Sequence, residues 1–394
     1  MKPNFRKTMN VCFVGYIVQA IVNNFVPLLF VTFQKSYGIP LSRITLLITF
    51  NFAVQLLVDC LSAGFVDRIG YRISIVLAHV LAAAGLILLT ILPELTGDPF
   101  YGILLSVTIY AVGGGLIEVL ISPIMDACPT ENKEAAMSLL HSFYCWGHMG
   151  VVLLSTGFFA LFGIENWKML ALLWAVIPVC NTLVFLKTPM PTLTEPGETG
   201  LRLPELFKIK SFWLLMLMMM CAGASEQAVS QWASTFAEEG LGVSKALGDL
   251  AGPMAFALLM GGARLLYGKL GHKLNLDRCM AISSGLCVLS YLLIALVPSP
   301  VLGLAGCALC GFSVGILWPG MLSKASASIR GGGTALFAML ALAGDVGCTA
   351  GPTIAGFVSS AAGGNLRAGI LGAIGFPALL LFGVALTKKQ GRTA

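Results

Sequence analysis

Long apolar runs follow one another along almost the whole chain, separated by short segments that carry Pro, Gly or charge. A helix needs about 20 apolar residues to cross the hydrocarbon core of a bilayer. Twelve runs reach this length, so the pattern predicts an all-α membrane protein with twelve transmembrane helices. The predicted spans lie near residues 11–33, 42–64, 73–93, 100–125, 136–163, 167–187, 211–235, 245–267, 277–298, 300–322, 333–358 and 366–387.

The longest polar stretch, 188–210, lies in the middle of the chain and separates six predicted spans from six more. We therefore expect an N-terminal six-helix bundle at 1–187, a cytoplasmic linker at 188–210 and a C-terminal six-helix bundle at 211–394. The first span follows the polar start MKPNFRKTMN without a small-residue cleavage site, so we expect it to be retained.

Basic residues are unevenly distributed among the predicted loops. If the N-terminus is cytoplasmic, 18 of the 24 Lys and Arg residues fall in cytoplasmic segments and 5 in external ones, with Arg264 inside the eighth span. Cytoplasmic loops of membrane proteins carry an excess of Lys and Arg. The bias predicts a multi-pass protein of the cell membrane with both termini in the cytoplasm.

The composition excludes several classes of protein. Charged residues make up 11% of the chain and the mean hydropathy is +0.89, whereas soluble domains carry about 25% charged residues. A disordered chain, a nucleic-acid binder and a soluble two-domain enzyme are therefore excluded. The eleven cysteines are scattered, and Cys307 and Cys310 have no histidine or second cysteine pair that would complete a metal site. We expect no enzymatic activity, no metal and no cofactor. The expected partners are the lipid bilayer and a small solute, without nucleic acid, and the expected state is a monomer.

The two halves carry weak internal matches in the same order. The matched pairs are offset by 196 to 202 residues: Ser42 with Ser244, Gly70 with Gly271, Pro123 with Pro319, and Gly147 with Gly344. Such a repeat predicts two six-helix bundles related by a pseudo-twofold axis, an arrangement in which transporters bind their solute near the bilayer midplane.

The loop after the second span, 64–72, reads GFVDRIGYR. It resembles the Gly-x-x-x-Asp-Arg-x-Gly-x-Arg signature of the major facilitator superfamily, with one residue fewer before the aspartate. A degenerate copy follows the eighth span, where that superfamily places it. The resemblance implies transport by alternating access, with a gating role for Asp67, Arg68 and Arg72. Asp126, near the cytoplasmic end of the fourth span, is a further candidate for a gating or capping residue.

Within that superfamily, three spans resemble the fucose-permease-like sugar:proton symporters. The matching pieces are the Asn-Asn-Phe and Phe-Gln of the first span, GGGLIE at 113–118 and LHSFYCWG at 140–147. The resemblance implies a sugar solute and an intramembrane glutamate, here Glu118. Pro27 stands where related members carry an aspartate in the first span, so one carboxylate of that family's proton relay is replaced.

Polar side chains inside the spans are the candidate solute-binding residues. They are costly in lipid and are tolerated mainly where they face a cavity or another helix. Amides both donate and accept hydrogen bonds, which suits sugar hydroxyls, and an indole can cover the apolar face of a sugar ring. Hydrogen bonding or packing between helices is the alternative role for each. The candidates are Gln19, Asn23, Asn24, Asn51, Gln55, Glu118, His141, Tyr144, Glu226, Gln227, Gln231, Trp232 and Trp318.

Three residues are candidates for proton coupling: Glu118, Asp345 and His148. Asp345 lies at the repeat position of His148 and could instead pair with it or with Arg264. No nucleotide-binding loop is present. We therefore predict a secondary active transporter for a monosaccharide or related sugar, coupled to protons through Glu118. The alternatives are a drug or metabolite exporter working as a proton antiporter, a uniporter or sodium-coupled carrier, and a transporter-like receptor or sensor.

Overall fold

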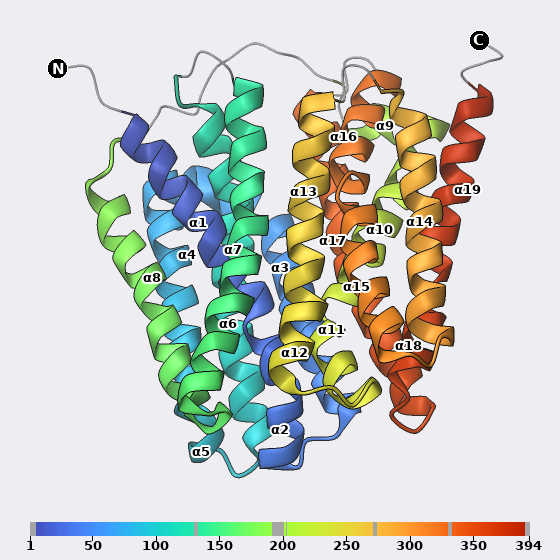
Figure 1. Ribbon diagram of the computed structural model, residues 1–394. Helices are drawn as coiled ribbons and strands as arrows, with labels where there is room; N and C mark the ends of the chain where they lie inside the picture. The colour runs from blue at the N-terminus through green and yellow to red at the C-terminus, as the bar shows by residue number, and fades with distance from the viewer. Residues whose placement is uncertain are drawn as a thin grey trace. The chain divides into compact units, whose positions relative to one another are not determined.

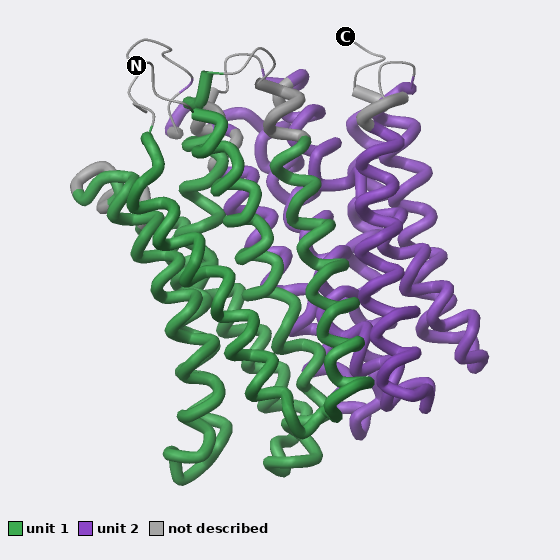
Figure 2. Tube along the Cα trace, turned by 60° about the vertical axis from the view of Figure 1, so that its left-hand side comes forward, with its two compact units in different colours: residues 1–195 green, residues 196–394 purple. Residues whose placement is uncertain are grey.

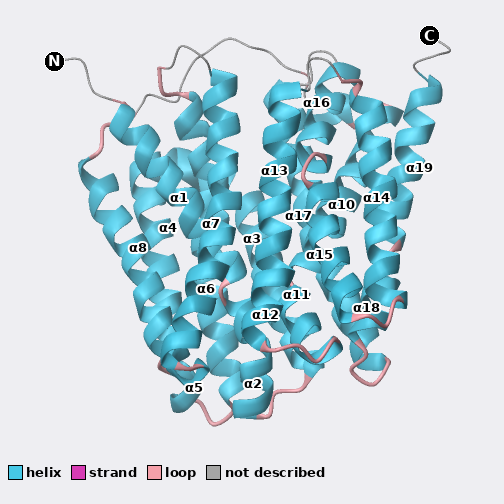
Figure 3. Ribbon diagram, in the orientation of Figure 1, coloured by secondary structure: helices cyan, strands magenta, loops and turns pink. Residues whose placement is uncertain are grey.

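The computed structural model describes residues 5–129, 133–190, 201, 203–270, 274–329 and 333–390. Nearly all of these residues are helical, and no strand occurs among them (Figure 3). The chain divides into two compact units, Met1–Glu195 (unit 1) and Pro196–Ala394 (unit 2), which Figure 2 distinguishes by colour. The division falls inside the polar stretch 188–210.

Unit 1 is a bundle of long helices with short connections (Figure 1). Within it, α1 packs against α6 and α7, whereas α3 and α4 pack against α6. The short helices α2 and α5 lie at the end opposite to the start of α1. The helices are α1 (Arg6–Asn24), α2 (Phe30–Tyr37), α3 (Leu41–Ile69), α4 (Tyr71–Leu89), α5 (Leu92–Leu95), α6 (Pro99–Asp126), α7 (Lys133–Phe162) and α8 (Trp167–Lys187).

Unit 2 is a second helical bundle, in which α10 packs most extensively against α17 and α14 packs against α15 and α19. Its helices are α9 (Leu203–Leu206), α10 (Lys210–Ser230), α11 (Ala233–Thr235), α12 (Lys245–Asp249), α13 (Ala255–Leu270), α14 (Leu276–Leu296), α15 (Pro300–Val314), α16 (Leu317–Ser328), α17 (Gly333–Ala361), α18 (Leu366–Gly372) and α19 (Gly375–Gln390).

The predicted spans are present as helical segments. Among the described residues, eleven segments are long and apolar enough to cross a membrane. The remaining predicted span, 333–358, coincides with α17, a helix of 29 residues. At 1.5 Å per residue α17 is about 44 Å long, which exceeds the hydrocarbon thickness of about 30 Å. The all-α membrane fold is therefore confirmed.

Several spans that the sequence predicts as single helices are interrupted. The first span breaks between α1 and α2 at a 3₁₀ turn, Val26–Leu29, where Pro27 lacks the N–H needed to continue the helix. The seventh span breaks after α10 and ends in a π-helix, Phe236–Gly240. The eighth contains another π-helix, Leu250–Met254, around Pro253. Irregular backbone at membrane depth is tolerated where protein or a water-filled cavity surrounds it, and all four residues of the Val26–Leu29 turn are buried.

One helix contact recurs in both units. In unit 1, Gly147 of α7 lies against α1, and a Cβ added there would lie 2.9 Å from Ala20 Cβ. In unit 2, the matching Gly344 of α17 lies against α10, where its carbonyl touches Gly223. A glycine therefore lets the first and fifth spans of each unit approach closely: Gly147 on the fifth span of unit 1 and Gly223 on the first span of unit 2.

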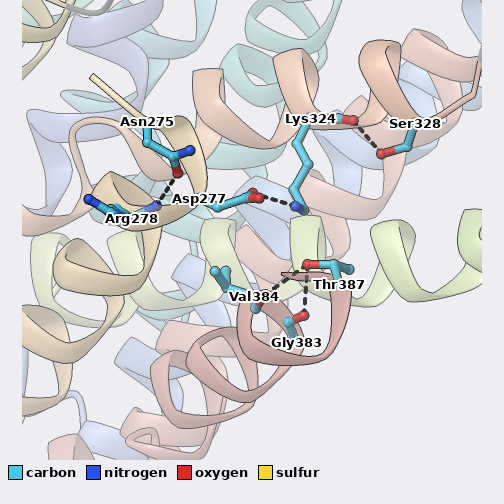
Figure 4. A network of polar contacts seen from close by, with 8 residues as sticks. All are labelled: Asn275, Asp277, Arg278, Lys324, Ser328, Gly383, Val384 and Thr387. Atoms are coloured by element: carbon cyan, nitrogen blue, oxygen red, sulfur yellow. Dashed lines mark hydrogen bonds and ion pairs between the residues drawn. The ribbon is translucent and has the colours of Figure 1, made fainter. Parts of the chain in front are cut away.

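Polar contacts fasten one end of unit 2 (Figure 4). Lys324 Nζ of α16 donates to Asp277 Oδ1 in the first turn of α14 at 2.5 Å. Asn275 Oδ1 accepts from the Arg278 N–H at 3.0 Å and caps the start of α14. The ion pair holds α14 and α16 together at a helix end, away from the middle of the spans.

Candidate functional site

Glu118 lies in the second half of α6 and contacts the first span directly. Its Oε2 accepts a hydrogen bond from Gln19 Nε2 of α1 at 3.0 Å. The same nitrogen donates to Gln55 Oε1 of α3 at 2.9 Å. One side-chain amide therefore links the intramembrane carboxyl group to two other helices.

The hydrogen bonds continue from Gln55 along a chain of amides. Gln55 Nε2 donates to Asn23 Oδ1 at 2.8 Å, and Asn51 Nδ2 donates to the same oxygen at 3.3 Å. All four amide side chains belong to residues that are at most 6% exposed. We call Gln19, Asn23, Asn51, Gln55 and Glu118 the amide cluster. It joins five of the residues predicted from the sequence.

Two oxygen atoms of the amide cluster differ from the others in their hydrogen bonding. Gln19 Oε1 and Asn51 Oδ1 are buried and accept no hydrogen bond from any residue that the structure describes. A buried polar atom left in this state costs about 1–3 kcal/mol. These two oxygens can therefore accept hydrogen bonds from a ligand hydroxyl or a bound water.

Three consecutive glycines of α6 make room for the amide cluster. Gly113 packs against the backbone of α4. A Cβ on Gly114 would lie 3.2 Å from Gln19 Oε1, and a Cβ on Gly115 would lie 3.0 Å from Gln55 Cα. Because no side chain fills this space, α1, α3 and α4 all approach α6 about one turn before Glu118.

Aromatic groups flank Glu118. Tyr16 of α1 shares a hydrogen bond of 3.0 Å with Ser122, which lies one turn after Glu118 in α6. The exposed ring of His141 meets the Tyr16 ring edge-on, with 5.3 Å between the centroids. The predicted His141 therefore contacts Tyr16, whose hydroxyl is bonded one helical turn from Glu118.

Asn24 and Tyr144 form a separate contact. Asn24 Nδ2 donates to the Ala20 carbonyl at 2.9 Å and to the Tyr144 hydroxyl at 3.3 Å. Since Asn24 ends α1, this contact joins α1 to α7 directly before the break in the first span.

Residues of the seventh span form a second chain, in unit 2. Gln231 Nε2 donates to Gln227 Oε1 at 3.0 Å, and Gln227 Nε2 donates to Glu226 Oε1 at 3.4 Å. Glu226 Oε2 lies 3.6 Å from Arg264 Nη2 of α13. The chain of polar groups thus runs from the break after α10 to a charge on another helix.

Both predicted tryptophans contact α17. Trp232 is fully buried, and its Nε1 donates to the Pro352 carbonyl at 2.9 Å. The partly exposed indole of Trp318 lies directly on Gly344. Stacking of a solute on either ring stays a prediction.

The other predicted residues have separate positions. His148 is buried in α7, and Asp345 is partly exposed in α17. Arg72 Nη1 donates to the Phe185 and Leu186 carbonyls at 3.0 and 2.9 Å, at the C-terminal end of α8. The side chains of the gating candidates Asp67, Arg68 and Asp126 lie outside the described residues.

A buried histidine network in unit 1 was not predicted from the sequence. His79 Nδ1 lies 2.8 Å from the Ile75 carbonyl. Because a carbonyl only accepts, Nδ1 carries the proton and Nε2 accepts from Asn181 Nδ2 at 2.9 Å. Asn181 Nδ2 also donates to the Val11 carbonyl at 3.1 Å. The network fixes the neutral imidazole and joins α1, α4 and α8.

A buried carboxylate in unit 2 was likewise not predicted. Asp249 is 1% exposed. Ser234 donates to its Oδ1, and Lys245 Nζ lies 3.0 Å from its Oδ2. These contacts connect α11 and α12, the short helices beside the two π-helices. Among the residues that the structure describes, no group of three or more His, Cys, Asp or Glu side chains is placed to hold a metal ion.

Ion pairs connect the segment between α4 and α6, which contains α5, to neighbouring helices. Glu94 Oε1 accepts from Lys168 at 2.6 Å and from the Tyr37 hydroxyl at 3.0 Å, and these contacts lower its pKa from 4.5. The backbone N–H of Phe100 and the Arg43 guanidinium, at 3.0 and 2.5 Å, lower the pKa of Asp98 from 3.8.

We expect these two carboxylates to make a small, pH-dependent contribution to stability. A lowered pKa in the folded state stabilises the protein fully above the ordinary pKa, and this stabilisation is lost as the pH falls through the lowered value. Melting temperatures of the wild type and the Glu94→Gln, Asp98→Asn double variant should therefore differ at pH 7 and converge towards pH 3. A difference that stays constant across this range would contradict the assignment.

The family model of the Major Facilitator Superfamily matches residues 11–352. This chain belongs to the major facilitator superfamily. As a member, it is a multi-pass membrane transporter for a small-molecule solute, and it is not an enzyme.

Solved structures of superfamily members have the same fold. The E. coli fucose:proton symporter is 16% identical over 96% of this chain and 98% of its own, with a TM-score of 0.64. A bacterial homologue of the human lysosomal transporter Spinster is 16% identical over 100% of this chain and 98% of its own, with a TM-score of 0.72. A search of curated proteins gave no match.

Proposed function

We propose that this transporter moves a small hydroxyl-bearing solute, a monosaccharide or related sugar, by alternating access, with Glu118 coupling the movement to protons. The observation that carries the proposal is the amide cluster. It combines buried amides with a carboxyl group at membrane depth, and Gln19 Oε1 and Asn51 Oδ1 remain available as acceptors. Sugar hydroxyls can donate to such acceptors and accept from amide N–H groups.

The contact between Gln19 and Glu118 offers a physical link between proton and solute. An ionised Glu118 only accepts hydrogen bonds, whereas a protonated one also donates. Gln19 bonds to Glu118 and to Gln55 at once. A change of protonation at Glu118 would therefore alter the hydrogen bonding of the residues proposed to hold the solute, and such coupling acts equally in both directions.

The fold similarity to a fucose:proton symporter supports the same solute class and coupling ion. The uneven distribution of Lys and Arg supports placement in the cell membrane with both termini cytoplasmic. Accessibility of single cysteines, introduced near each terminus of a variant whose eleven native cysteines are replaced by serine, tests this orientation when measured in intact and permeabilised cells. Labelling of either terminus in intact cells would contradict it.

Uptake of labelled monosaccharides by proteoliposomes tests the proposed function. A gradient of one pH unit supplies about 1.4 kcal/mol per proton, enough for a tenfold solute gradient with one proton per solute. We expect accumulation with an inward proton gradient and only equilibration without one. Accumulation that does not depend on the pH gradient but depends on a sodium gradient would contradict proton coupling. Absence of uptake for every monosaccharide would contradict the solute class.

A further inference from the structure

Arg264 is a cation inside a membrane span. Its side chain does not extend towards the nearer end of its helix. It lies in α13, close to the end of the span Lys245–Tyr267. An arginine in this position can reach the interface by extending its long side chain outwards. Here Nη2 contacts Met260 Sδ at 3.8 Å, one turn back along the helix. The guanidinium therefore points into the span.

The main chain and one carboxylate orient the guanidinium. Nε donates to the Gly315 carbonyl at 3.2 Å, at the break between α15 and α16. Gly315 permits this approach, because a Cβ there would lie 2.8 Å from Ala263 Cβ. With Nε held in this way, the Nη2 group faces Glu226. A planar guanidinium fixed along one edge is well suited to bind a carboxylate.

The ion pair between Arg264 and Glu226 is loose. The distance of 3.6 Å between Nη2 and Oε2 exceeds the 2.7–2.9 Å of a charge-assisted hydrogen bond. The side chains are 19% and 11% exposed, so the pair is only partly removed from solvent. Glu226 also accepts a long hydrogen bond of 3.4 Å from Gln227. Glu226 thus balances the charge of Arg264 without a tight bond that an incoming anion would have to break.

We propose that Arg264 forms a carboxylate-binding subsite in unit 2, at which an acid group of the solute replaces Glu226 as the counter-ion. This inference rests on the proposed function and narrows its solute class to hydroxylated carboxylic acids, such as sugar acids. Leaving the displaced Glu226 ionised and unpaired at membrane depth would be costly. Glu226 therefore takes up one proton as the carboxylate binds, and the net charge of the subsite is unchanged.

Proton uptake by Glu226 has to be distinguished from proton uptake by other ionisable groups nearby. Those with described side chains on helices that contact α10 are Tyr291 on α14, Cys307 and Cys310 on α15, Lys324 on α16, and Asp345 and Cys348 on α17. Lys324 is already paired with Asp277 at 2.5 Å. Replacing Glu226 alone therefore tests whether it is the group that takes up the proton.

Binding of D-glucuronate, D-glucose and acetate to the purified full-length protein, measured by calorimetry at pH 6 and pH 8, tests the subsite. We expect glucuronate to bind about 10- to 100-fold more tightly than glucose at pH 6, the range typical of one hydrogen bond to a charged group. This preference should weaken at pH 8. Glu226→Gln should retain it at both pH values. The charge-neutral double variant Glu226→Gln, Arg264→Gln should lose it, and thermal melting shows whether that variant is folded.

Arg278→Gln, which removes an exposed cation from the same unit, is the matched control and should bind glucuronate as the wild type does. Equal affinity for glucuronate and glucose, or a preference that survives removal of Arg264, overturns the subsite. If the protein binds neither glucuronate nor acetate, the subsite is overturned as well. Proton-driven uptake of glucose without any preference for glucuronate overturns the subsite alone. Tight glucuronate binding without transport of any sugar or sugar acid overturns the proposed function alone.

Discussion

Replacing Glu118 with glutamine is expected to abolish proton-driven accumulation of the solute while leaving exchange of solute across the membrane intact. A glutamine has nearly the same volume, and its amide oxygen can still accept from Gln19 Nε2, which now lies 3.0 Å from Glu118 Oε2. The amide cannot bind and release a proton near neutral pH. With an inward gradient of one pH unit, the accumulation ratio should fall from about ten towards one.

Three measurements on proteoliposomes separate loss of coupling from loss of folding. Counterflow of labelled solute should persist in Glu118→Gln, whereas uptake against a concentration gradient and solute-induced proton movement should vanish. Glu94→Gln is the matched control, because it changes an exposed carboxylate of the short helix α5 between two spans and should leave all three readouts unchanged. Full uphill transport by Glu118→Gln would refute the role of Glu118 as the proton-coupling group.

The spans could be predicted because each is encoded locally. About twenty apolar residues in sequence suffice to identify a membrane helix, whatever packs against it. The break in the first span was also encoded locally, by Pro27. The π-helix before Ala255 had a proline too, but its position depends on packing, as does that of the π-helix at Phe236–Gly240.

Contacts between helices were only partly predictable. Asn51 and Gln55 are one turn apart, so their shared face could be inferred from helical periodicity. Their partner Asn23 lies on another helix, and its position depends on how α1 and α3 are rotated about their axes. Sequence periodicity carries no information on that relative rotation. For the same reason, the contact between Arg264 and Glu226 could not be inferred from the sequence.

The glycines of α6 illustrate which helix contacts can be predicted from the sequence. The run of glycines before Glu118 could be recognised in the sequence as a site of close helix contact. Which helix each glycine meets could not be recognised. Gly113 faces α4 and Gly115 faces the backbone of Gln55, whereas Gly114 faces the side-chain amides of Gln19 and Gln55. Two neighbouring positions of one motif thus serve ordinary packing and the proposed binding site.

Replacing Gly347 with alanine is expected to destabilise unit 2 by about 3 kcal/mol or more, the upper part of the range for overpacking a core. Gly347 of α17 lies against α10, where an added Cβ would overlap the Met220 carbonyl oxygen and lie 2.8 Å from the Ala224 nitrogen. Both are backbone atoms, so no side-chain rotation can relieve the overlap. The two helices would have to separate along their extensive contact.

Gly285→Ala provides the matched control, because Gly285 of α14 has open space where its Cβ would lie. Alanine favours a helix over glycine by about 1 kcal/mol, so this substitution should leave the melting temperature unchanged or raise it. The same chemical change is therefore expected to have opposite signs at two helical positions of one unit. Melting curves of the purified variants test this directly. Equal melting temperatures for Gly347→Ala and Gly285→Ala would mean that the close approach of α10 and α17 does not limit the stability of the unit, and that helix propensity alone governs both positions.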